Sequence, residues 1–279
     1  QGIFIRNSGN VLVRDNVIGF SNDGIQVTDA ATSAHYICDN QIGVITDGIS
    51  SAIDVGNRFG GVVLLGNGTR LNNSLTQCTS SARNYIGYNN WGLYIAGDDN
   101  IISNVHIGGT TGVTFGNNTR GVVYKSGATD NYLDQSTVFN NGSTGIVLEA
   151  SAGTGNHIHP SVVLSGNVQS TGIDLGGNGV SLNDAGDIDS GPNELMNYPE
   201  VSQVIQGDAG LEVTFRLDHD QMGVSDPVVS FYLADGNTRQ GRKLIGSVNY
   251  DGANHTWRLA TLPAVTETGD LFLVARATD

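Results

Sequence analysis

The sequence predicts an all-β fold: a right-handed parallel β-helix (solenoid) followed by a small antiparallel immunoglobulin-like β-sandwich. Three observations lead to this prediction. A pattern of glycine, apolar, variable and apolar residues recurs along residues 1–180, and short alternating strands replace it after residue 200. The composition also disfavours long helices, because the chain has 39 glycines and many asparagines.

Each copy of the tetrad marks one coil. Neighbouring glycines include spacings of 22, 24 and 27 residues (2 to 24, 121 to 145 and 145 to 172). Because strand side chains alternate, the first and third residues after glycine are expected in a core and the second in solvent. Stacked coils then share one continuous core. The copies start at Gly2, Gly24, Gly61, Gly92, Gly121, Gly145 and Gly172, with a degenerate copy at Gly48.

Asparagines punctuate the coils at a regular phase before the apolar residues. Asparagine tolerates left-handed backbone and bonds its own backbone at turns. The phase also predicts that these side chains stack as a ladder from coil to coil. The residues are Asn16, Asn40, Asn84, Asn100, Asn131 and Asn156.

The periodicity stops at Val180, so we divide the chain into a β-helix (1–180), an acidic Asp/Gly-rich linker (181–200) and a sandwich (201–279). Several short alternating strands within about 80 residues are typical of a sandwich. The expected strands are Leu211–Leu217, Val228–Leu233, Lys243–Asn249, His255–Ala260 and Leu271–Thr278.

Two strings resemble those of secreted bacterial right-handed parallel β-helix repeat proteins with a C-terminal immunoglobulin-like domain. One is a succession of three dipeptides, Ile-Gly, then Gly-Asn, then Gly-Val, which occurs within residues 42–62 and again within residues 107–122. The other is the segment 183–199, which resembles the end of such helices. The resemblance implies the architecture and an extracellular or cell-surface location, but a shared fold does not carry an activity.

The charge and the cysteines limit the partners and the compartment. A net charge of −14 makes nucleic acid a poor partner, because such binding depends on Lys and Arg. No run of 18 apolar residues occurs, so no membrane span is expected. Cys38 and Cys78 are either a disulfide of an oxidising compartment or two buried thiols, and the sequence favours neither.

The linker carries the clearest candidate metal site. Its four carboxylates all lie in one 11-residue stretch of a Gly-rich loop, where they would repel one another unless neutralised. Oxygen ligands of this kind suit Ca²⁺. The alternative is a solvated acidic linker. The candidate ligands are Asp184, Asp187, Asp189, Asn193 and Glu194.

Aromatic residues concentrate near one coil. Exposed aromatic side chains there would stack on a sugar ring, whereas ordinary packing against a neighbouring loop is the favoured alternative. The residues of this candidate glycan-binding group are Tyr85, Tyr88, Trp91 and Tyr94.

Two further pairs of residues are candidate sites. His157 and His159 place two imidazoles on one side of a strand, but two ligands do not make a zinc site. Asp98-Asp99 resembles a catalytic carboxylate pair, yet the strings of polygalacturonases do not accompany it. A turn before Ile101 is the simpler interpretation.

These observations favour a non-catalytic extracellular structural or adhesive module, a segment of a larger cell-surface protein or filament. The chain opens directly on a repeat coil and stops on a strand, so neighbouring copies or segments of the same protein are expected partners. The alternatives are a polysaccharide-degrading enzyme (a lyase or glycoside hydrolase) and a glycan-binding module on the β-helix that contacts cell-surface or extracellular polysaccharide.

Overall fold

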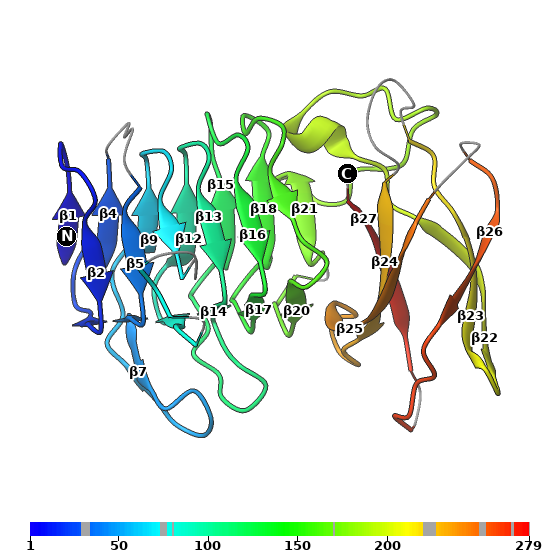
Figure 1. Cartoon of the computed structure of the whole chain (residues 1–279), viewed down its shortest axis with the longest axis horizontal. Helices are drawn as coiled ribbons and strands as arrows, with labels where there is room; N and C mark the ends of the chain where they lie inside the picture. Colours follow the sequence, from blue (N-terminus) through cyan, green and yellow to red (C-terminus); the bar gives the residue numbers. More distant parts are fainter. Residues whose placement is uncertain are drawn as a thin grey trace.

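A computed structural model describes residues 1–28, 34–72, 77–79, 81–169, 171–219, 227–250, 255–268 and 271–278. Residues 12–176 form a parallel β-solenoid of about 6 turns, and small antiparallel sheets follow it (Figure 1). The predicted all-β solenoid is therefore confirmed.

Three parallel sheets form the sides of the solenoid. The sheet that carries the glycine tetrads, here called the tetrad sheet, contains β1 (Ile3–Ile5), β4 (Ile25–Val27), β9 (Gly60–Leu64), β12 (Trp91–Ile95), β15 (Val122–Tyr124), β18 (Ile146–Glu149) and β21 (Ile173–Gly176). The second sheet contains β2 (Leu12–Arg14), β5 (Tyr36–Cys38), β10 (Arg70–Leu71), β13 (Ile101–Ser103), β16 (Tyr132–Asp134) and β19 (His157–Ile158). The third contains β3 (Val17–Ile18), β6 (Gln41–Ile42), β11 (Asn84–Ile86), β14 (Val105–Ile107), β17 (Thr137–Phe139) and β20 (Val163–Ser165).

The degenerate tetrad at Gly48 does not form a coil. It lies at the turn of an antiparallel hairpin between β7 (Val44–Thr46) and β8 (Ala52–Asp54). The Asp47 carboxylate accepts backbone N–H bonds from Ile49, Ser50 and Ser51, which closes the turn. The prediction for this copy was wrong, because local turn bonds replace the pairing with a neighbouring coil.

The apolar residues of the tetrads fill the core as predicted. In the middle coils, the residues one and three places after glycine are fully buried, as Val62 and Leu64 illustrate. The prediction that the residue between them faces solvent holds for Phe4, which is 48% exposed, but fails for Val123. The same failure applies to Val63, Val147 and Asp174, all of which are buried.

Charged side chains gather on the same face of the tetrad sheet. Glu149 bonds to both Arg120 and Lys125, so three charged side chains meet on the outer face of the tetrad sheet. The apolar stems of such side chains cover their neighbours while the charged ends stay in water. Asp174 is buried for a different reason, since its carboxylate accepts N–H bonds from Gly177 and Gly179 in the following turn.

Close approach of the coils explains why every tetrad before the last coil begins with glycine. A Cβ atom on Gly92 would lie 2.5 Å from the Gly121 carbonyl oxygen and 2.5 Å from a methyl group of Ile107. It would also lie 2.9 Å from the Asn117 side-chain nitrogen. No side chain fits between backbones at these distances, so glycine is required here by space rather than by backbone angle.

Side-chain amides form three ladders, here called the first, second and third amide columns. In each, the side-chain oxygen of one residue accepts an N–H from its neighbour in the preceding coil. The predicted ladder is confirmed, although its residues belong to two columns and a third was missed. The first column is Asn16, Asn40 and Asn84. The second is Asn100, Asn131, Asn156 and Asn193. The third is Asn57, Asn89, Asn117, Asn141, Asn167 and Gln240.

Cys38 and Cys78 form a disulfide, with their Cα atoms 5.7 Å apart. Both are buried and pack with Ala82 and Tyr36 at the side of the solenoid. Of the two alternatives left open by the sequence, the bonded pair is therefore the one observed. Within the described ranges, no helix is long and apolar enough to cross a membrane.

Beyond the solenoid, two antiparallel sheets enclose a second core. One contains β22 (Glu200–Gly207), β23 (Gly210–Arg216) and β26 (Arg258–Leu262), and the other β25 (Gly241–Asn249), β24 (Val228–Ala234) and β27 (Leu273–Thr278). Phe215 of the first packs edge-on against Phe231 of the second. All five expected strands are present with shifted ends, whereas β22 was not expected. The immunoglobulin-like topology and the domain limits at 180 and 200 stay predictions.

Candidate metal centre

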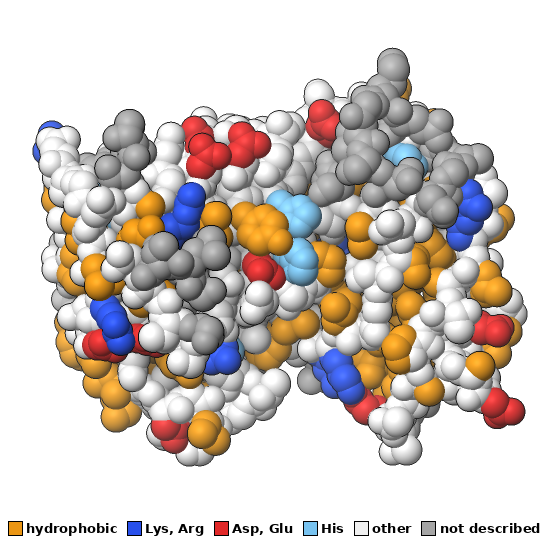
Figure 2. All heavy atoms as spheres, viewed as in Figure 1, with side chains coloured by type: hydrophobic (Ala, Val, Ile, Leu, Met, Phe, Trp, Pro, Cys, Tyr) orange, Lys and Arg blue, Asp and Glu red, His pale blue; other side chains and the backbone are white. Residues whose placement is uncertain are grey.

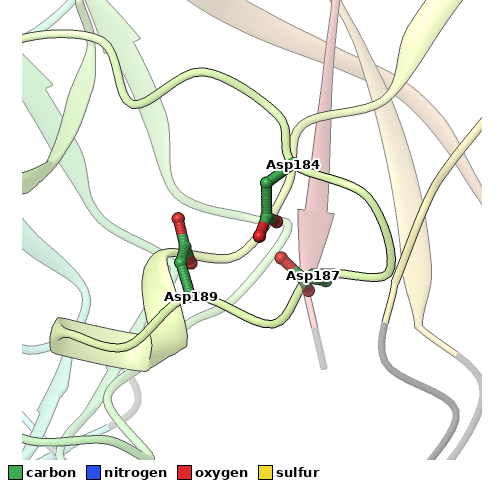
Figure 3. Close-up of side chains that lie close together, drawn as sticks. All are labelled: Asp184, Asp187 and Asp189. Atoms are coloured by element: carbon green, nitrogen blue, oxygen red, sulfur yellow. The ribbon is translucent and has the colours of Figure 1, made fainter.

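Asp184, Asp187 and Asp189 come together in the segment between the solenoid and the antiparallel sheets. One carboxylate oxygen from each lies within 4.8 Å of the others, and all three residues are half-buried. Figure 3 shows the three side chains converging from different parts of one loop. This arrangement can hold a metal ion, as the sequence predicted for these residues.

Asn197 fixes the loop that carries the three aspartates. Its backbone N–H donates to Asp187 Oδ1 at 2.9 Å, and its side-chain oxygen accepts the Asp184 N–H at 2.9 Å. Its side-chain amide donates to the carbonyl oxygens of Asp184 and Asp218. These bonds tie the loop to Asp218, which follows β23, and the Asn197 side chain that makes them is buried. The sequence analysis missed this residue.

The electrostatics of the trio favour a bound cation. The Oδ1 atoms of Asp184 and Asp189 are buried and have no hydrogen-bond partner among the described residues. Burial, followed by the charges of Asp184 and Asp189, raises the pKa of Asp187 to about 6, against the lowering effect of the Asn197 N–H bond. Burial and Asp184 also raise the pKa of Asp189. Oxygen-only ligands of this kind suit Ca²⁺, whose charge would offset the repulsion.

The other two predicted ligands are not part of this carboxylate group. Asn193 ends the second amide column: its Oδ1 accepts the Asn156 N–H at 3.1 Å and its Nδ2 donates to the Asn156 carbonyl at 2.7 Å. Glu194 is exposed and does not belong to the carboxylate group. The structure thus brings together three of the five candidate residues and uses Asn193 to continue a ladder.

The four predicted glycan-binding aromatics do not form one strip. Tyr85 lies on β11 of the third sheet and stacks on His106, with ring centres 5.2 Å apart. Trp91 and Tyr94 lie on β12 of the tetrad sheet, with ring centres 5.7 Å apart. The Tyr88 hydroxyl donates to the Thr114 carbonyl. Tyr85 thus contacts a neighbouring coil, whereas Trp91 and Tyr94 contact each other on one strand. Glycan binding by these residues stays a prediction.

A different aromatic group lies on the outer face of the second sheet. The Tyr132 and His157 rings stack in parallel, 4.9 Å apart at 6°, and His159 lies 5.9 Å from His157. His159 Nδ1 is 2.8 Å from Ser161 Oγ and 3.1 Å from Asp134 Oδ1. Figure 2 shows histidines exposed beside an apolar side chain on this face. The two histidines are recognisable in the sequence as a pair, whereas Tyr132, Asp134 and Ser161 meet them only in the folded chain.

Asp98 and Asp99 lie in a turn, as the simpler interpretation proposed. Asp98 Oδ1 accepts bonds from the N–H and the hydroxyl of Thr129 in the next coil. Asp99 has a left-handed backbone with φ of 56°, and its carbonyl accepts a bond from Arg70. The Asp98 carboxylate therefore joins two neighbouring coils.

Comparison with known proteins does not assign the chain to a family. No protein-family model matches it, and no curated protein is similar to it in sequence. The resemblance to secreted bacterial β-helix proteins therefore stays a prediction, and the function has to be argued from the residues themselves.

We expect calcium to raise the melting temperature of the chain at pH 7.5, and Asp187→Asn to remove this response. A ligand at 100 times its Kd stabilises the folded state by about 2.7 kcal/mol. Without metal, the raised pKa of Asp187 stabilises the fold only while the carboxyl is protonated. Stability from this group is complete below the unfolded pKa of about 4 and is lost as the pH rises through about 6.

The matched control is Asp208→Asn, because Asp208 is exposed in the turn between β22 and β23. This variant should keep the calcium response of the parent. Thermal unfolding with calcium and with chelator, between pH 4 and pH 8, measures both effects. An unchanged melting temperature in the parent on adding calcium would contradict the metal site.

Proposed function

We propose that this chain is a non-catalytic extracellular structural module that holds the antiparallel sheets at a fixed distance from the first coil of the solenoid. The observation that carries the proposal is the continuation of the third amide column across the joint. Gln240, which lies just before β25, takes the place of the next asparagine: its Oε1 accepts both the backbone and side-chain N–H of Asn167. Its Nε2 donates to the carbonyls of Asn167 and Gln169.

Further contacts support a fixed joint. Asp235 Oδ2 accepts bonds from the Ser165 hydroxyl and the Gly166 N–H, at 3.1 and 3.0 Å. The Tyr232 hydroxyl donates to the Pro160 carbonyl at 2.8 Å, and Arg276 donates to the carbonyl of His159. Interfaces between flexibly linked domains need no such set of directed bonds, so the contacts favour a rigid spacer.

The Cys38–Cys78 disulfide supports a location outside the cytoplasm, because disulfides persist in oxidising compartments. A cation held by Asp184, Asp187 and Asp189 would stiffen the segment that crosses the joint. We further propose that this module is a segment of a larger cell-surface protein or filament, and that its partners are neighbouring copies or segments of the same protein.

A distance measurement between spin labels tests the spacer. One label replaces Leu12 on the first coils and the other replaces Asn237 in the turn before Gln240, and both positions are exposed. We expect one narrow distance distribution in the parent and a broader one in Gln240→Ala. The matched control is Gln203→Ala on β22, which should leave the distribution narrow. A broad distribution in the parent would refute the proposal.

Glycan binding is the second candidate function. The observation that favours it is the stacked Tyr132–His157 pair, with the Asp134 carboxylate beside it. Sugar rings stack on aromatic faces and their hydroxyls bond to carboxylates. Incubation on an array of acidic and neutral polysaccharides should give binding that Tyr132→Ala removes. Release of oligosaccharides on the same array would instead support the polysaccharide-degrading alternative, and no binding would count against both.

A further inference from the structure

A cavity of about 280 Å³ lies between the last coil of the solenoid and the sheet formed by β25, β24 and β27. This volume is near the lower end of the roughly 300–1,000 Å³ of small-molecule sites. Its walls come from both parts of the chain. The apolar side chains that line it include Ile158, Leu164, Ile173, Leu175, Met196 and Val274.

The charge of the lining is opposite to that of the protein. The chain has 27 acidic and 13 basic residues. Among the described residues that line the cavity, however, two are arginines, Arg239 and Arg276, and none is acidic. Chance would place acids here more often than bases, so the lining points to a negatively charged occupant.

Arg276 has the features of an incompletely paired, half-buried cation. Its two terminal nitrogens donate to the His159 and Val162 carbonyls, at 2.7 and 3.5 Å, and its guanidinium lies 5.1 Å above the Tyr232 ring. Its Nε, which is itself buried, has no hydrogen-bond partner among the described residues, and the same is true of the buried Thr278 hydroxyl in the same lining. No carboxylate pairs with Arg276 among the described residues. Burying a cation without an anion is costly, and arginine is well suited to bind a carboxylate.

We infer that this cavity binds a small amphipathic monocarboxylate of the fatty-acid type. The carboxylate would neutralise Arg276, and the alkyl chain would cover the exposed end of the solenoid core at Ile173 and Leu175. Burial of the chain supplies about 0.8 kcal/mol for each CH₂ group. A phosphate carries a second charge, for which the described lining offers no second buried arginine. The inference goes beyond the proposed spacer function, although the cavity lies at the same joint.

Titration calorimetry at pH 7.5 with three probes of equal chain length tests the site: octanoate, octan-1-ol and octylamine. We expect saturable binding of octanoate, weaker binding of octan-1-ol and none of octylamine. Arg276→Gln should weaken octanoate binding by about tenfold or more, the loss expected for one charged hydrogen-bond partner. Arg6→Gln, at the other end of the molecule, is the matched control and should bind as the parent does.

A second variant covers the case in which Arg276→Gln does not fold. Leu175→Trp narrows the cavity from the solenoid side, where Leu175 is half-buried, and should abolish octanoate binding while retaining the fold by circular dichroism. The inference fails if octanoate shows no binding, if octan-1-ol binds as tightly, or if folded Arg276→Gln or Leu175→Trp binds octanoate as the parent does.

Discussion

Replacing Gly92 with alanine should lower the free energy of unfolding by about 3 kcal/mol or more, the upper part of the range for overpacking. The added methyl group would meet the Gly121 carbonyl oxygen and an Ile107 methyl group, each at 2.5 Å. Backbone cannot move aside as a flexible side chain does, because Gly121 belongs to a coil that is paired on both sides. Denaturant unfolding followed by circular dichroism measures the change.

Gly236→Ala is the control for this prediction. Gly236 is exposed in a turn, and a Cβ atom there would meet nothing within 4 Å. This variant should stay within about 0.5 kcal/mol of the parent. Equal unfolding midpoints for Gly92→Ala and the parent would show that the coils are further apart than the structure has them.

Asn117→Ala should also destabilise the chain, by about 3 kcal/mol. Asn117 Oδ1 accepts both the backbone and side-chain N–H of Asn89, and its own amide donates to Asn141 Oδ1. Removing it leaves two buried donors of Asn89 without an acceptor, and each such group costs about 1–3 kcal/mol. The same denaturation experiment measures this loss.

The neighbouring asparagine gives a matched comparison. Asn118 is exposed, and among the described residues only its backbone N–H, which donates to the Asn89 carbonyl, joins it to the preceding coil. Asn118→Ala should therefore change stability by less than about 0.5 kcal/mol. If the two variants lose equal stability, the amide column contributes nothing beyond the backbone pairing.

The sequence predicted those parts of the fold that depend on local repetition. Glycine and alternating apolar residues define the tetrad sheet, because close packing and core burial impose the same requirement on every coil. Strand β22 could not be predicted in this way. Its residues from Val201 to Gly207 are exposed, so the strand has no buried face and no alternation to read.

The candidate metal centre was predicted in part for a similar reason. Closely spaced aspartates in one loop reveal a shared carboxylate site, and three of them converge. The role of Asn193 depends instead on Asn156, which lies 37 residues earlier and meets it only after the coils have stacked. Contacts between residues so far apart in the sequence leave no local pattern. The contact between Asn167 and Gln240, which are 73 residues apart, could not be predicted for the same reason.

The third amide column also has a direction. The NH₂ group of each asparagine in it donates to the side-chain oxygen of the next member of the column, so the side-chain dipoles add head to tail and polarise one another. Such a chain would end in a donor without an acceptor. Gln240 resolves this, because its longer side chain turns its NH₂ group back onto the carbonyls of Asn167 and Gln169. The antiparallel sheets thus act as the terminator of a polar chain that begins near the first coils.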